Sequence, residues 1–162
     1  MKNPAQNPSD LPDTLYFSEP HPNSSGEKFV VFSLGDELFA VSAKNVSEVV
    51  QPLEITPLPN APEWLYGICN LRGEIVSVIN LPKLWQTGIP TNFAKSKLII
   101  LREQTGAIGL ATDRLSEIVN LPDEAIQPCE NNSRIYAKAV HNAKNLNLID
   151  TKKLFSAIGS VV

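Results

Sequence analysis

Short runs of apolar and β-branched residues, separated by tight turns, recur along most of the chain. The first five strands are expected at residues 28–34, 38–42, 46–50, 65–71 and 74–81. Gly35-Asp36 and Arg72-Gly73 lie between consecutive runs, so each is expected to close a β-hairpin. Stretches with the period of an amphipathic helix are nearly absent. The pattern therefore predicts an all-β protein made of small barrels or a sandwich.

The same pattern occurs twice. At an offset of 69 residues, 28–32 align with 97–101, 38–41 with 107–110, and 46–50 with 115–119. After one inserted residue the match resumes, and 80–85 align with 150–155. The chain is thus predicted to contain two versions of one unit, about residues 28–85 and 97–155. A unit of this size is marginally stable alone, so the two are expected to share an apolar face.

The first 27 residues differ in amino-acid composition from the rest of the chain. They contain five of the 13 prolines together with many Asn and Ser residues. Such a segment has too little apolar surface to offset its ordering entropy, which predicts a flexible leader followed by a single domain over 28–162. Tyr16-Phe17 is its most apolar spot, and a second interpretation is that this pair docks on the domain.

Composition narrows the function classes. Fourteen Lys and Arg against 17 Asp and Glu give a net charge of −3, which argues against a nucleic-acid-binding surface. No apolar run approaches the roughly 20 residues of a membrane span, and the N-terminus has no signal-peptide pattern. A soluble, cytoplasmic protein is expected. Cys69 and Cys129 are not at metal-ligand spacing, and no catalytic or phosphate-binding motif occurs, so neither an enzyme nor a cofactor nor a metal is predicted.

Residues 58–84 (LPNAPEWLYGICNLRGEIVSVINLPKL) resemble the signature stretch of the CheW family of chemotaxis coupling proteins. The most specific element is Gly67-x-x-Asn70-Leu71-Arg72-Gly73 followed by an apolar strand, and 29–50 resemble the family's first three strands. The resemblance extends from residue 28 to about 156. It implies two intertwined five-stranded SH3-like β-barrels with a short C-terminal helix.

The resemblance implies a non-enzymatic adaptor. CheW-like proteins couple the cytoplasmic tip of a methyl-accepting chemoreceptor to the regulatory domain of the histidine kinase CheA, in membrane-bound receptor arrays. The output that the resemblance implies is chemotaxis or pilus-based motility. One departure is Asn80, where many relatives carry Asp, and it suggests a divergent branch that serves pilus motility or another chemosensory array rather than flagellar chemotaxis. The alternative from the residues alone is a two-lobed barrel that binds a ligand or single-stranded nucleic acid, against which the acidic balance stands.

Five residues are candidates for partner binding: Val46, Glu48, Asn70, Arg72 and Gly73. The first two and Arg72 correspond, by resemblance, to positions at or near the family's partner-contacting region. The guanidinium of Arg72 presents five donors suited to a carboxylate. It is expected either to bind a partner or to pair within the fold, for example with Glu48.

The internal repeat helps to distinguish a structural role from a partner-binding role for Arg72 and Glu48. The turn equivalent to Arg72-Gly73 contains His141-Asn142-Ala143, so the arginine occurs in one unit only and is not needed merely to close a barrel. Glu48 aligns with Glu117, which is expected to be structural, so Glu48 itself is open to either role.

Overall fold

The computed structural model describes residues 26–89, 96–130 and 134–159, and its elements form two series in the same order. The first series comprises β1 (Glu27–Leu34), β2 (Glu37–Ser42), the 3₁₀ turn η2 (Ala43–Asn45), β3 (Val46–Val50), β4 (Ile55–Thr56), β5 (Leu65–Leu71), β6 (Glu74–Ile79) and α1 (Leu81–Trp85). The second comprises β7 (Lys97–Glu103), β8 (Gly106–Thr112), β9 (Arg114–Leu121), the 3₁₀ turn η4 (Asp123–Ala125), β10 (Gln127–Pro128), β11 (Ile135–His141), β12 (Lys144–Ile149) and α2 (Thr151–Gly159). The predicted leader lies outside the described residues except for Gly26 and Glu27, and Glu27 already belongs to β1.

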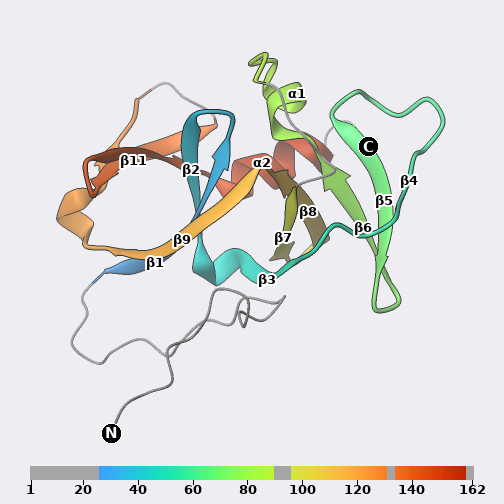
Figure 1. Ribbon diagram of the computed structural model, residues 1–162, viewed down its shortest axis with the longest axis horizontal. Coiled ribbons are helices and arrows are strands. Elements are labelled where there is room, and N and C mark those ends of the chain that lie inside the picture. Colours follow the sequence, from blue (N-terminus) through green and yellow to red (C-terminus); the bar gives the residue numbers. More distant parts are fainter. Residues whose placement is uncertain (1–25, 90–95, 131–133, 160–162) are drawn as a thin grey trace, which may run out of the picture.

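The strands form two sheets, and each sheet contains strands from both series. One sheet has the order β10-β11-β12-β2-β1-β9 and the other β3-β7-β8-β6-β5-β4. We call them barrel A and barrel B; they lie side by side with α2 between them (Figure 1). Replacing each strand by its repeat equivalent converts one order into the other. The two sheets therefore have the same strand order when the strands of one series are exchanged for those of the other.

A repeat unit is not itself a barrel. The β1–β2 hairpin of the first unit pairs with β9 and, in parallel, with β12 of the second. The β7–β8 hairpin likewise pairs with β3 and β6 of the first unit. This exchange confirms the intertwined SH3-like architecture. Each sheet has five longer strands and a two-residue edge strand, β4 or β10, where the proline-rich connections allow only brief pairing.

The exchange explains why β1 and β7 each contain four consecutive apolar residues, 29–32 and 98–101. Phe29 and Val31 of β1 face a cluster inside barrel A, whereas Val30 and Phe32 join a central cluster made by both sheets and both helices. In β7 the even and odd positions divide in the same way between the interior of barrel B and the central cluster. A strand buried on both faces cannot show simple alternation. The central cluster is the apolar face that the two units share.

Each short helix begins at an equivalent capping residue. The Oδ1 atom of Asn80 accepts a hydrogen bond from the Lys83 amide at 3.1 Å, and the Oδ1 atom of Asp150 accepts one from the Lys153 amide at the same distance. Asn and Asp are comparable N-caps. The replacement of Asp by Asn in the first unit therefore leaves this local function intact.

Candidate partner-binding site

A β-bulge at the start of β3 sets the directions of Val46 and Glu48. Val46 is paired with Leu101 and Glu48 with Ile100, so no β7 residue lies opposite the intervening Ser47 in the strand register. In a regular strand Val46 and Glu48 would point to the same face. Here Val46 is 8% exposed and packs in the central cluster, while the Glu48 carboxylate reaches the tip of the β5–β6 hairpin.

That tip is a two-residue turn with both central residues in the left-handed region. Arg72 has φ 50° and Gly73 has φ 87°, which is the signature of a type I′ turn. Asn70 holds the turn, because its Oδ1 atom accepts a hydrogen bond from the Gly73 amide at 2.7 Å. A Cβ atom at Gly73 would meet nothing within 4 Å, so the backbone angle rather than space selects glycine there.

The turn presents Arg72 beside Glu48. The Nη2 atom of the guanidinium donates to the Oε1 atom of the carboxylate, joining residues 24 positions apart in sequence. The Glu48 side chain is only 12% exposed, whereas that of Arg72 is 69% exposed. The carboxylate thus lies at the base and the guanidinium on top, with much of its donor surface facing solvent. Such an arrangement can bind a carboxylate or a carbonyl of another protein.

A second arginine, which sequence reasoning missed, lies next to this pair. Both terminal nitrogens of Arg102 donate to the Glu74 carboxylate, at 2.9 and 2.6 Å, and its Nε donates to the Ser47 hydroxyl at 3.1 Å. The hydrogen bond from Arg102 lowers the pKa of Glu74. In the repeat alignment Arg102 falls on Ser33, so it, like Arg72, is a charge found in one unit only. The presence of a charge at this position in one repeat unit and not in the other is the sequence feature that could have identified Arg102.

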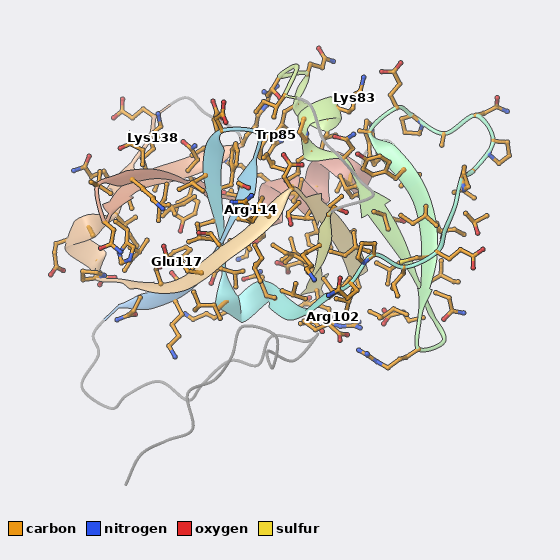
Figure 2. The ribbon with its side chains drawn as sticks, in the orientation of Figure 1. Lys83, Trp85, Arg102, Arg114, Glu117 and Lys138 are labelled. Atoms are coloured by element: carbon orange, nitrogen blue, oxygen red, sulfur yellow. The ribbon has the colours of Figure 1, made fainter. Side chains whose placement is uncertain are left out.

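Barrel A carries a weaker version of the same arrangement. Glu117, the equivalent of Glu48, has its carboxylate 3.8 Å from the Nε2 atom of His141 at the end of β11. Figure 2 places Glu117 on barrel A and Arg102 at the lower edge of barrel B. The equivalent of Arg72 is Asn142, which has the same left-handed φ of 50°. A histidine one position earlier therefore approaches the carboxylate, and the central turn position that carries Arg72 in barrel B carries the neutral Asn142 in barrel A.

The five candidates therefore fall into two directly bonded pairs and one core residue. Glu48 contacts Arg72, Asn70 contacts Gly73, and Val46 packs in the central cluster. In the described parts of the chain no group of three or more His, Cys, Asp or Glu side chains is arranged to hold a metal ion. Nor does any helix described here have the length and apolarity needed to cross a membrane.

A family model for the CheW-like domain matches residues 28–159. The chain belongs to the CheW family. Among curated proteins, it is 30% identical over 145 residues to the chemotaxis protein CheW of Treponema pallidum, covering 83% of this chain and 85% of that protein. It is 26% identical over 117 residues to the protein FrzA of Myxococcus xanthus, covering 72% and 71%.

The CheW-like fold is also seen in a solved structure. The crystal structure of the scaffolding protein TtCheW from Thermoanaerobacter tengcongensis matches with a TM-score of 0.72 and 32% identity, over 77% of this chain and 89% of that one. The family match agrees with the resemblance carried by residues 58–84. The site described above lies in that stretch and in the β3 and β7 strands beside it.

Proposed function

We propose that this CheW-like protein is a non-enzymatic adaptor that couples chemoreceptors to a CheA-type histidine kinase. Its output would be chemotaxis or pilus-based motility. The observation that carries the proposal is the CheW-like domain over residues 28–159, which includes nearly all the described chain. The names of the matched proteins support it, because they are chemotaxis proteins and a scaffolding protein.

The fold suits an adaptor that acts by geometry. Strand exchange and the central cluster join the two barrels, so we expect the barrels to move together as one rigid body. Surfaces on such a body can hold two partners at a set distance and angle. We expect the partners to be the cytoplasmic tip of a receptor and the regulatory domain of the kinase, with the protein recruited from the cytoplasm to receptor arrays.

Within this function, Arg72 is the residue that we expect to contact a partner directly. Its guanidinium is exposed and presents donors in a fixed planar geometry, and Glu48 restricts its orientation from below. Asn70 and Gly73 hold the turn that presents it. Val46 is proposed to support the site from the core, since its 8% exposure leaves little surface for contact.

A three-component capture experiment tests the proposal. A receptor signalling fragment is immobilised, and purified CheA-type kinase is added with or without this protein. Retention of the kinase should require the wild-type chain, and the receptor-dependent change in kinase autophosphorylation should follow the same requirement. If the kinase is retained equally well without it, or if it binds neither partner at tens of micromolar, the coupling function is wrong.

A further inference from the structure

A cavity of about 350 Å³ lies between the two short helices, away from the Arg72 site. Its apolar lining comes from Leu84 and Trp85 of α1 and from Leu154 and Ala157 of α2. Two cationic residues, Arg134 and Lys153, and one acidic residue, Asp150, also line it, so its charged edge has an excess of one positive charge. An apolar hollow with positive charge at its edge fits an aromatic side chain flanked by carboxylates.

The sequence of this chain contains such a segment. Residues 13–19 read Asp-Thr-Leu-Tyr-Phe-Ser-Glu, with two adjacent aromatic residues, one acid at each end and no basic residue. The segment precedes β1, and the rest of the leader is dominated by Pro, Asn and Ser. It is therefore the part of the leader with the chemistry that the cavity complements.

The described chain starts close to the cavity. Leu148 of β12 is level with Ala40 of β2, which places Asp150 level with Ser42, and Ser42 donates a 2.6 Å hydrogen bond to the Glu27 carboxylate. β12, β2 and β1 are consecutive in the sheet, and Ser42 is level with Phe29, two residues after Glu27. Asp150 and Glu27 are therefore separated by two strand spacings across the sheet and two residues along β1, or about 12 Å. Asp150 lines the cavity.

A second observation agrees with this proximity. The pKa of the Tyr136 hydroxyl is raised, first by burial and then by the negative charges of Glu27 and Asp150. Both carboxylates therefore lie near the same side chain. The nine residues from 18 to 26 can span about 30 Å when extended, which is more than twice the distance from Glu27 to Asp150.

We propose that residues 13–19 of this chain dock in the cavity between α1 and α2, with Tyr16 or Phe17 inserted and Asp13 and Glu19 near its cationic edge. A short covalent tether gives an effective concentration in the millimolar range. A contact with only millimolar intrinsic affinity would then be about half populated. Self-docking of this kind covers an apolar hollow in the free protein.

The test is two-dimensional NMR of the full chain. Replacing both aromatics (Tyr16→Ala with Phe17→Ala) should shift the Trp85 indole resonance and the amide resonances of Leu84, Leu154 and Ala157. The control Leu11→Ala removes an apolar side chain from the same leader but outside the segment, and should leave those resonances in place. Unmoved resonances, or shifts confined to the sheets, would overturn the proposal.

A charge reversal on the cavity gives an independent arm. Lys153→Glu should move the Tyr16 and Phe17 ring resonances towards their free-peptide positions, whereas Lys152→Glu, on a neighbouring surface of α2, should not. Both substitutions put an acid in the first turn of α2, which favours the helix and so protects the fold. Equal effects of the two would overturn the proposal. So would Trp85 shifts that vary with protein concentration, since a second copy would then be the occupant.

Discussion

Replacing Arg72 by Asn separates partner binding from folding better than replacing it by Ala. Arg72 has a left-handed backbone, and Asn tolerates that conformation better than most residues. Asn-Gly is also the preferred pair for a type I′ turn, and barrel A already has Asn142 at the equivalent position. Arg72→Asn thus deletes the charge while keeping the turn.

The magnitudes follow from the exposure of the ion pair. With the Arg72 side chain 69% exposed, its bond to Glu48 is screened by solvent and contributes about 0.2–1 kcal/mol to folding. The favourable turn residue offsets part of that loss, so the free energy of unfolding should change by less than about 1 kcal/mol. A charge-assisted hydrogen bond to a partner contributes about 1.5–3 kcal/mol, which corresponds to roughly tenfold to hundredfold weaker binding.

The assay pairs urea unfolding with titration calorimetry against the kinase and, separately, the receptor fragment. Arg114→Ala is the control, because Arg114 is an exposed arginine on barrel A (Figure 2). Weakened binding to at least one partner, with stability retained and the control unaffected, is the expected result. Unchanged affinity for both partners in a folded Arg72→Asn protein would refute the role of Arg72.

Glu48→Gln shows how the carboxylate contributes. If Glu48 acts by orienting the guanidinium, Glu48→Gln should weaken binding in the wild-type background and have almost no further effect beside Arg72→Asn. If Glu48 itself touches the partner, the two losses should add. A double-mutant cycle of binding free energies distinguishes these outcomes, and additivity would show that the carboxylate is not an orienting group.

Three further predictions concern stability and reactivity. Ala143 has φ 62°, a left-handed conformation in which the Cβ atom costs about 1–2 kcal/mol. Ala143→Gly removes that cost but gives the unfolded chain more conformational freedom, which offsets about 0.4–1 kcal/mol of the gain. The urea midpoint should therefore rise, and an unchanged or lower midpoint would contradict this account of strain. Because Arg102 lowers the pKa of Glu74 below its usual 4.5, the pair stabilises the fold above that pH and the contribution disappears as pH falls through the folded-state value. The stability difference between wild type and Glu74→Gln should therefore shrink on acidification, and a gap that stays constant from neutral pH down to the lowest pH at which both proteins fold would disprove the linkage. Burial raises the pKa of the Cys69 thiol, so a thiol reagent at neutral pH should label the more exposed Cys129 first and reach Cys69 only on unfolding; equal rates would show that barrel B opens readily.

Local sequence determined the strands, the turns and the repeat. Gly35 and Gly73 have the positive φ values that tight hairpins require, and the structure has turns at both places. The prolines between residues 51 and 62 limit that stretch to the two-residue strand β4. These features depend on steric rules that act over a few residues, so they can be predicted without knowing the fold.

The site was only partly predictable, because its contacts join residues that lie far apart in the sequence. The resemblance and the turn chemistry selected Glu48 and Arg72, but both an internal and an external partner for the arginine remained open. The inward direction of Val46 depends on a bulge at Ser47, and the bond between Arg102 and Glu74 joins residues 28 positions apart. Nothing in the local pattern specifies such pairs.

Tertiary structure decided which copy of each strand pairs with which. The two repeats carry nearly the same apolar pattern, so β1 could equally have paired with β3 of its own unit as with β9 of the other. Exchange lets β1 and β7 bury both faces, one in a barrel and one in the central cluster. Apolar burial therefore favours the intertwined arrangement over two separate units. That choice brings β7, and with it Arg102, beside β3 and the Arg72 turn.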